Sequence, residues 1–260
     1  MADPAARVAV VTGASRGVGR GVAAALDDAG MRVYATGRAI DRAMLPDGVV
    51  RVACDHTEDA AVEQLFARVE RESGRLDVLV NSAWGGYERM VENGRFTWGL
   101  PFWEQPAWRW DAMITAGVRA AFVASQLAAR LMVPARRGLI VNISHWAAQK
   151  RIGNTLYGIA KAATDKLTND TAIELRPHSV AVVSLYPGLV RTEAVLGAGV
   201  FDLSNSESPE FIGRAVHGLF TDPELLALSG QTLVAADLAR RYGFTDIDGK
   251  APRPLTLGDV

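Results

Sequence analysis

Short apolar segments alternate with amphipathic helical segments along almost the whole chain, and this alternation limits the possible folds more than any other feature. The apolar segments are Arg7–Thr12, Arg32–Thr36, Val49–Cys54, Leu76–Val80, Leu139–Ser144 and Val180–Tyr186, with Gln231–Ala235 as a candidate seventh. Such runs, when helices separate them, are typical of buried parallel strands. The sequence therefore predicts an α/β fold with a doubly wound parallel sheet of about seven strands and helices on both faces.

The intervening segments carry apolar residues at helical spacing and end at a glycine or a proline. They run from Val18 to Ala29, from Val62 to Val69, from Trp110 to about Pro134, from about Thr155 to Leu175, and from Pro209 to Leu219 behind the capping residue Ser208. Glycine favours a helix C-terminus and proline stops a helix, so these boundaries are well marked. No repeat or long linker interrupts the pattern, and we expect a single domain over residues 1–260.

Composition and charge exclude several classes of protein. Hydrophobic residues make up 49% of the chain and the net charge is −1, which gives no electrostatic basis for binding nucleic acid or an anionic membrane. The single cysteine, Cys54, excludes an intrachain disulfide, and the four histidines lack metal-ligand spacing, so no metal site is predicted. Residues Met1–Arg7 lack the apolar run of a signal peptide, and we expect a cytoplasmic location.

One long segment, residues 84–110, shows neither helical nor strand periodicity. It is rich in glycine and aromatic residues, and a loop of this length inside a compact domain is usually functional. Trp84 and Tyr87 are candidates for an apolar substrate wall. Trp103, Trp108 and Trp110 are expected to pack structurally, because a tryptophan at the start of a helix usually lies in the core.

A glycine-rich turn follows the first apolar segment, in the pattern Gly13-Ala-Ser15-Arg16-Gly17-Val18-Gly19. Glycines at a strand-to-helix turn let backbone N–H groups approach a phosphate, and the helix N-terminus adds positive potential. In a strand–helix–strand context this turn indicates a Rossmann-type dinucleotide site.

The residue after the second strand distinguishes the two nicotinamide dinucleotides. An acidic residue there would accept a hydrogen bond from the ribose 2′-hydroxyl of NAD. This chain has Arg38 instead, and Arg16 lies in the glycine-rich turn. Because two guanidinium groups can clamp a phosphate, NADP(H) is predicted in preference to NAD(H).

Tyr157 and Lys161 are spaced i, i+4 and therefore share one face of the predicted helix. A phenol with a pKa near 10 needs a shift of roughly three units, about 4 kcal/mol, to serve as a base at neutral pH. A neighbouring ammonium group supplies part of that shift, so the pair predicts a general acid/base, with Tyr157 carrying the proton.

Taken together, these features resemble the short-chain dehydrogenase/reductase family over nearly the whole chain. The motifs are Thr12–Gly19, Asp55, Asn81-Ser82-Ala83, Tyr157-x-x-x-Lys161 and Pro187-Gly188. Phe102–Pro106, Leu131–Ala135, Ala162–Lys166 and Asp237–Gly243 further resemble the subfamily named after dehydrogenase/reductase family member 1.

The resemblance implies an oxidoreductase that interconverts a carbonyl and an alcohol, and it assigns expected roles along the chain. Asp55 and His56 are expected near the adenine, Asn81 to Ala83 near its ribose, and Pro187, Gly188, Val190 and Thr192 near the nicotinamide and phosphates. A mobile substrate lid is expected over about residues 192–209, and a homodimer or homotetramer is expected from the helices that begin near Gln105 and Thr155.

Two positions depart from the family pattern. The family usually has an asparagine in the long central helix to hold a relay water, and Gly117 aligns there. The serine that orients the substrate carbonyl is Ser144 when counted back from Tyr157, and this is the residue we select. Counting along the strand from Asn142 selects His145, which stays open as the alternative. These departures leave a second possibility, a non-catalytic NADP(H)-binding sensor or scaffold.

Overall fold

Seven parallel strands form one central sheet in the computed structural model, which describes residues 6–199 and 201–260. The strand order is β11-β8-β7-β4-β1-β2-β3, and every neighbouring pair is parallel. The strands are β1 (Val8–Val11), β2 (Arg32–Gly37), β3 (Val50–Ala53), β4 (Val78–Asn81), β7 (Gly138–Ile143), β8 (Val180–Tyr186) and β11 (Thr232–Val234). The predicted α/β class and the seven-stranded parallel sheet are confirmed.

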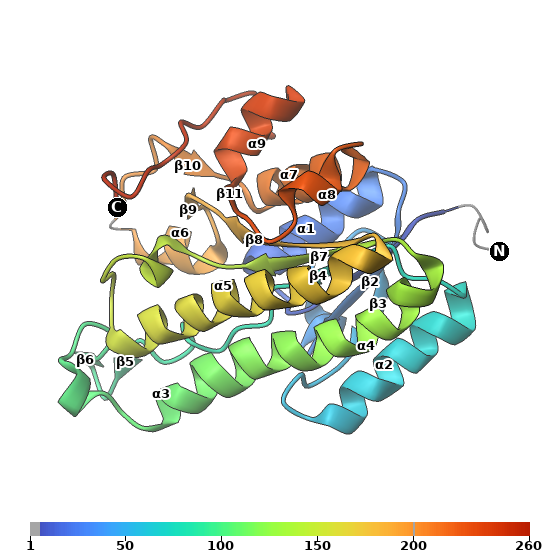
Figure 1. Cartoon of the computed structure of the whole chain (residues 1–260). Helices are drawn as coiled ribbons and strands as arrows, with labels where there is room; N and C mark the ends of the chain where they lie inside the picture. Colours follow the sequence, from blue (N-terminus) through green and yellow to red (C-terminus); the bar gives the residue numbers. More distant parts are fainter. Residues whose placement is uncertain (1–5, 200) are drawn as a thin grey trace.

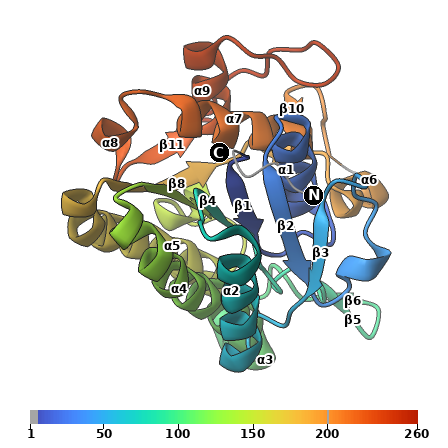
Figure 2. The ribbon, with the colours of Figure 1, turned by 90° about the vertical axis from the view of Figure 1, so that its right-hand side faces the viewer.

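Helices cover both faces of the sheet, as Figures 1 and 2 show. One layer contains α1 (Gly17–Asp28), α7 (Pro209–Thr221), α8 (Leu225–Leu228) and α9 (Ala235–Tyr242), and the other contains α2 (Asp59–Ser73), α4 (Ala120–Ala135) and α5 (Thr155–Leu175). Short helical turns lie in the connections: η1 (Ile40–Arg42), η2 (Phe102–Glu104), η4 (Trp146–Ala148), η5 (Arg176–His178) and α6 (Glu193–Ala198).

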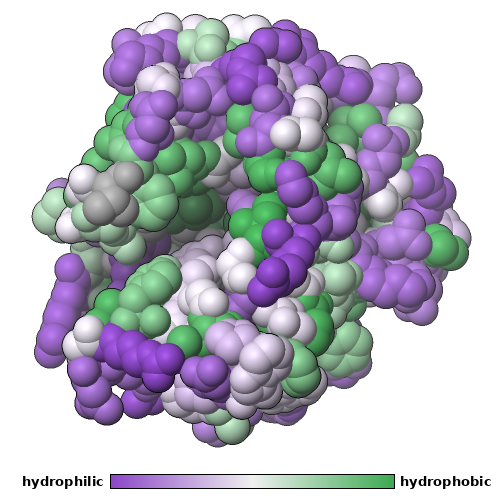
Figure 3. Space-filling model, turned by 90° about the vertical axis from the view of Figure 1, so that its left-hand side faces the viewer, coloured by the Kyte–Doolittle hydropathy of each residue, from purple (hydrophilic) through white to green (hydrophobic). Residues whose placement is uncertain are grey.

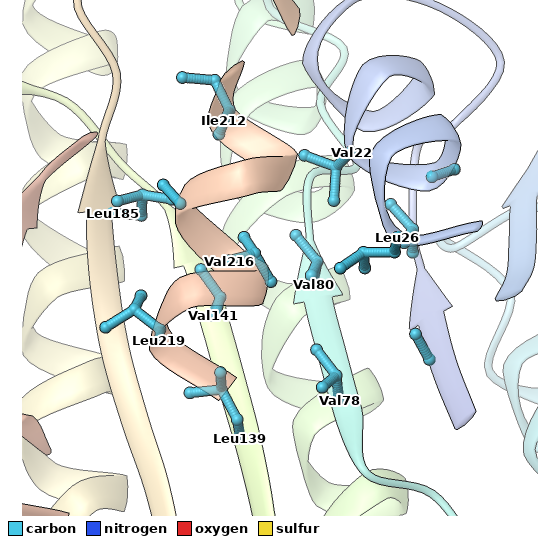
Figure 4. Close-up of a cluster of buried hydrophobic side chains, with 14 of the residues drawn as sticks. Val22, Leu26, Val78, Val80, Leu139, Val141, Leu185, Ile212, Val216 and Leu219 are labelled. Atoms are coloured by element: carbon cyan, nitrogen blue, oxygen red, sulfur yellow. The ribbon is translucent and has the colours of Figure 1, made fainter. Parts of the chain in front are cut away.

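Alternate residues of each strand supply the two cores. Val78 and Val80 of β4 pack on Val22 of α1 and Val216 of α7, as Figure 4 shows. Leu79, between them in sequence, belongs to the core under the opposite helices. Both faces are buried, which is why the strands read as continuous apolar runs, and each fully buried aliphatic side chain contributes about 1.5–3 kcal/mol.

Side-chain caps fix where α5 and α7 begin. The Asn154 side chain accepts a hydrogen bond from the Tyr157 N–H at 2.9 Å, and α5 has the predicted bounds. The Ser208 hydroxyl accepts from the Phe211 N–H at 3.0 Å and begins α7, as predicted. Such caps are worth about 1 kcal/mol each.

The long central helix runs from Trp108 to Ala135 and contains an unpredicted π-helical segment. Its parts are α3 (Trp108–Trp110), the π-helical segment η3 (Asp111–Arg119) and α4. Within the described residues, this one helix has the length and composition to cross a membrane, although a core helix of a soluble protein meets the same criterion. Here α4 packs in the core shared with α2 and α5.

The aperiodic segment before this helix forms a small hairpin, β5 (Val91–Glu92) with β6 (Arg95–Phe96). A second small pairing joins β9 (Leu189–Val190) to β10 (Ser206–Glu207) and brings the two ends of the 192–209 segment together. Both pairs lie at the carboxyl end of the main sheet, beside the strand ends that position the site (Figure 1).

Candidate active site

The carboxyl ends of the strands form a hollow on one side of the molecule. Figure 3 views this side and shows the hollow bordered by hydrophobic surface. Neighbouring strands β1 and β4 leave the sheet toward opposite layers, because β1 leads into α1 while β4 leads toward α4. Open α/β sheets bind ligands in the crevice at such a switch point.

The glycine-rich turn has a backbone conformation that requires glycine. Gly13 and Gly17 have φ values of +66° and +57°, which favour glycine. A Cβ at Gly13 would lie 2.6 Å from the Ala83 Cα, and a Cβ at Gly19 would lie 2.5 Å from the Gly13 carbonyl oxygen. The turn, the start of α1 and the end of β4 therefore meet closely, and only residues without side chains fit there.

A carboxylate occupies the anion position at the start of α1. Glu193 accepts from the Gly17 N–H at 2.9 Å and from the Arg20 Nε at 3.0 Å. Helix N-termini bind phosphate in the same way, with exposed N–H groups and a favourable dipole, so this carboxylate stands where a phosphate oxygen would bind.

A second carboxylate brings together the two arginines predicted to bind a 2′-phosphate. The Nη2 atoms of Arg16 and Arg38 donate to one oxygen of Glu88, at 2.9 and 2.8 Å. Both guanidinium groups are mostly exposed, with 64% and 61% of their side-chain areas accessible. Two cations converging on one anion is the arrangement that a phosphate would need, and the donors present fit a dinucleotide with a 2′-phosphate.

The two residues expected around the adenine, Asp55 and His56, differ in their exposure. Asp55 accepts from the N–H and hydroxyl of Thr57 at the end of β3 and is partly exposed. The His56 side chain is buried, and its Nε2 lies 2.7 Å from the Thr36 hydroxyl. Burial lowers the pKa of His56 to about 4, so its side chain is neutral at pH 7. The contact with Thr36 shows that the ring faces the sheet.

Asn81 uses its side chain to join strands and helices. Its Nδ2 donates to Asn142 at 2.8 Å and to Ser125 at 2.9 Å, and Asn142 donates to Thr168. Ser82 and Ala83 instead present their backbone N–H groups to the Thr12 hydroxyl. The amide of Asn81 therefore locks the end of β4 in place, beside the segment expected to meet the ribose.

The Pro187-Gly188 turn is held by a residue that sequence reasoning missed. Buried Glu207 accepts from the Gly188 N–H at 2.8 Å, and burial raises the pKa of Glu207 to about 7. Val190 is buried in β9, and Thr192 caps α6 through its hydroxyl. Glu207 is distant from Gly188 in the sequence, and the pairing of β9 with β10 brings the two together. No local sequence signal indicates this contact.

Tyr157 and Lys161 lie one turn apart on α5, and both are buried. The Lys161 Nζ donates to the Ile143 carbonyl at 3.2 Å. Burial lowers the pKa of Lys161 to about 8, although Asp165 opposes the shift. Burial, and next the neighbouring Tyr87, raises the pKa of Tyr157 well above its usual value, so the tyrosine is protonated at neutral pH.

Aromatic rings enclose Tyr157 on several sides. Centroid distances to its ring are 5.8 Å for Trp84, 5.3 Å for Trp98, 6.1 Å for Tyr87 and 5.4 Å for His145. The Tyr87 hydroxyl donates to the Tyr157 hydroxyl at 3.0 Å. The expected wall residues Trp84 and Tyr87 are therefore brought to the candidate site.

Ser144 and His145 point to different surroundings. The Ser144 hydroxyl donates to the Lys161 carbonyl at 3.3 Å and lies beside the Tyr186 hydroxyl. His145 has extended backbone angles, φ −163° and ψ 156°, and side chains alternate sides along extended backbone. Its ring faces Tyr157, and its Nδ1 accepts from the Ala147 N–H at 3.1 Å, which leaves Nε2 as the protonated nitrogen.

The aperiodic segment folds around one buried cation that the sequence did not reveal. Arg109 is fully buried and donates to the carbonyl oxygen and the hydroxyl of Thr97 and to Gln105. Trp98 and Trp108 stack near its guanidinium. The expectation that Trp103 and Trp110 pack structurally is wrong, since their side chains are 74% and 50% exposed at the surface of the aperiodic segment.

Three comparisons with known proteins agree on the class of this chain. The short chain dehydrogenase family matches residues 7–198. The mouse (Mus musculus) dehydrogenase/reductase SDR family member 1 is 45% identical over 94% of this chain and 84% of its own length.

Two solved structures show the same fold at low identity. The NADPH-dependent reductase YwfH of bacilysin biosynthesis superposes with a TM-score of 0.73 at 22% identity, covering 89% of this chain and 97% of its own. The 3-ketoacyl-(acyl-carrier-protein) reductase of Brucella melitensis, complexed with NADH, has a TM-score of 0.75 at 21% identity and covers 88% of this chain and 96% of its own.

Proposed function

The chain belongs to the short-chain dehydrogenase/reductase family, and on this basis we propose that it is an NADP(H)-dependent oxidoreductase that interconverts a carbonyl and an alcohol. The main observation in support of this proposal is that Tyr157 and Lys161 are both buried on α5, at the carboxyl end of the sheet, where the glycine-rich turn also lies. A phenol beside an ammonium group can carry a proton to or from a substrate oxygen.

The family implies a nicotinamide cofactor, and the donors of this chain fit one. The Gly13–Gly19 turn would hold the pyrophosphate, where Glu193 now accepts from Gly17. Arg16 and Arg38 would hold a 2′-phosphate, where they now share Glu88, and this supports NADP(H) over NAD(H). When bound, the cofactor supplies or accepts the hydride.

Burial keeps the pKa of Tyr157 high and the hydroxyl protonated at neutral pH, and this is the form that carbonyl reduction needs. Its hydroxyl proton passes to the substrate oxygen, and Lys161 stabilises the phenolate that remains. In the oxidative direction the same phenolate accepts the alcohol proton. The Tyr87 hydroxyl donates to the Tyr157 oxygen, which leaves the Tyr157 O–H proton available for a substrate oxygen.

We propose that His145 orients the substrate carbonyl. This residue replaces Ser144, which the sequence favoured for that role. Its neutral ring faces Tyr157, and its pKa is lowered to about 4 by burial and by Lys161, so the ring donates a hydrogen bond without adding charge. The Ser144 hydroxyl is already engaged with the Lys161 carbonyl, on the opposite side of the extended chain.

The surroundings favour a bulky apolar substrate. Trp84, Tyr87 and Trp98 form the wall around Tyr157, and the segment 192–209 is proposed as the lid over it. A cytoplasmic homo-oligomer remains our prediction for the assembled protein.

Steady-state reduction of a broad panel of ketones and aldehydes, with NADPH and with NADH, tests this function. We expect turnover with NADPH and its loss in Tyr157→Phe, while cofactor binding persists. Tight NADPH binding without turnover of any carbonyl or alcohol would instead identify a non-catalytic sensor. Binding of neither cofactor would overturn the proposal.

A further inference from the structure

The Trp84 indole lies in a slot made by two glycines. A Cβ at Gly86 would lie 2.7 Å from Trp84 ring atoms, and a Cβ at Gly117 would lie 2.8 Å from its Cε3 atom. Real Cβ contacts are not this short, so neither position accepts even alanine without moving the indole. Gly117 belongs to the π-helical segment η3, and π turns of this kind often lie at functional sites.

The indole in this slot faces the buried cation of the site. The Lys161 Nζ lies 4.3 Å from the Trp84 ring centroid, inside the range of a cation–π interaction. Among residues 6–199 and 201–260, the structure gives Lys161 one hydrogen-bond acceptor for its ammonium, the Ile143 carbonyl, and no carboxylate within ion-pair distance. The Trp84 ring, which is closer to this ammonium than the Tyr157 ring at 5.8 Å, is then the nearest aromatic group that stabilises the charge.

The same indole also contacts the tyrosine. The Trp84 and Tyr157 rings meet edge to face, with centroids 5.8 Å apart and an interplanar angle of 69°. Other titratable groups around the cation are Asp165, one turn further along α5, and His145 after β7. Trp84 therefore contacts both members of the Tyr157–Lys161 pair through its aromatic ring.

Given the acid/base role proposed above for Tyr157, on which this inference rests, we propose that Trp84 is a positioning residue. Its indole holds the Lys161 ammonium beside Tyr157, and the glycines at 86 and 117 exist to admit the indole. The wall of the pocket thus contributes to the proton chemistry as well as to substrate packing.

Trp84→Phe and Trp84→Leu separate this role from simple packing. Both remove bulk, but phenylalanine retains an aromatic face and leucine does not. The readout is the pH dependence of kcat for alcohol oxidation, whose rising limb follows ionisation of Tyr157. For Trp84→Leu we expect the limb to move up by about one pH unit, a roughly tenfold loss of kcat on the limb. Trp84→Phe should retain most of the wild-type profile.

Trp98→Leu is the matched control. Trp98 also stacks on Tyr157, at 5.3 Å, but its described contacts include no lysine ammonium. Its loss should raise KM for a bulky substrate and leave the pH limb in place. Equal limbs for wild type, Trp84→Leu and Trp98→Leu would overturn the inference, as would equal shifts in both leucine variants.

A second variant tests the slot without removing the indole. Gly117→Ala places a methyl group against Trp84, so it should shift the same limb in the wild-type background and shift it less in Trp84→Phe, whose smaller ring leaves room. Equal effects in the two backgrounds would contradict the slot. A wild type that binds NADPH but turns over no substrate overturns the proposed function itself, and this inference with it.

Discussion

The two ends of the candidate cofactor groove satisfy their charges in opposite ways. At the phosphate end, Arg16 and Arg38 are exposed and share the Glu88 carboxylate. A second carboxylate, that of Glu193, accepts a hydrogen bond from the first residue of α1. At the catalytic end, Lys161 is buried and is held by one carbonyl oxygen and an aromatic face. Exposed ion pairs are worth about 1 kcal/mol or less and exchange readily, whereas a buried charge depends on every neighbour.

This difference teaches which kind of change each end tolerates. Anions at the phosphate end can be exchanged for one another, because water and salt already screen the arginines. At the catalytic end, one altered side chain changes the charge state of the others, because the environment is apolar. Substitutions should therefore affect binding at the first end and chemistry at the second, and the following predictions test that separation.

The largest effect is expected from Tyr157→Phe. Removing the proton donor should lower kcat by about 10³-fold, within the range that positioned general acids supply. The dissociation constant for NADPH, measured by fluorescence titration, should change little, because the phosphate end is intact. A variant that retains more than a tenth of the wild-type kcat would show that another group carries the proton.

His145→Ala should come next, with a loss of about 10²-fold in kcat, as when one preorganised donor to a developing oxyanion is removed. His145→Gln keeps an N–H donor and should recover part of the loss. Ser144→Ala is the comparison, and we expect it to cost less. If the serine variant lost more activity than the histidine variant, Ser144 would be the orienting residue after all.

Arg38→Ala should weaken NADPH binding by about 10–100-fold, the loss expected for a charge-assisted hydrogen bond of about 1.5–3 kcal/mol. NADH binding should be nearly unchanged. Arg42→Ala, which removes an exposed arginine outside the pair, is the control for net charge. Equal weakening of both cofactors in Arg38→Ala would break the assignment of this end to a 2′-phosphate.

Glu207→Gln should change how stability depends on pH. The folded-state pKa of Glu207, raised by burial to about 7, lies above its usual 4.5. The carboxyl therefore favours the folded state below pH 4.5, and this contribution is lost as pH rises toward 7. Glutamine keeps an acceptor for Gly188 and removes that loss, so the variant should gain about 1–3 kcal/mol at pH 8 relative to pH 4.5. Urea unfolding at the two pH values measures it, and parallel pH profiles for wild type and variant would contradict a buried, titrating Glu207.

Glu88→Gln should have the smallest effect. Its carboxylate competes with a phosphate for Arg16 and Arg38, so neutralising it should strengthen NADPH binding a few-fold and leave NADH unaffected. The gain should shrink in high salt, where exposed charges are screened. Weaker NADPH binding in Glu88→Gln would show that Glu88 takes part in holding the cofactor.

Much of the framework could be predicted from sequence, because periodicity and caps are local. The bounds of α5 and β8 agree with the prediction, and the i, i+4 spacing of Tyr157 and Lys161 correctly places both on one face of α5. The glycine-rich turn was also identified from its glycine spacing, and in the structure Gly13 and Gly17 have positive φ.

The remainder could not be predicted, because it depends on distant or aperiodic contacts. Glu88 and Glu193 reach the turn from two segments without periodicity, and Glu207 reaches Gly188 across a small strand pair. The π-helical segment has no compositional signature, and it carries Gly117 to Trp84. Neighbouring serine and histidine could be separated only by the direction of the backbone after β7.

The buried guanidinium of Arg109 has a consequence for how this protein can diversify. The aperiodic segment, residues 84–110, is held together by hydrogen bonds from that side chain to Thr97, Gln105 and the Arg89 carbonyl, all of which lie within the segment. The segment that presents Trp98 to the pocket therefore carries its own internal anchor. Exposed residues of the segment, such as Phe102 and Trp103, can therefore vary without loss of that anchor, whereas Trp84 and Glu88 contact the site itself.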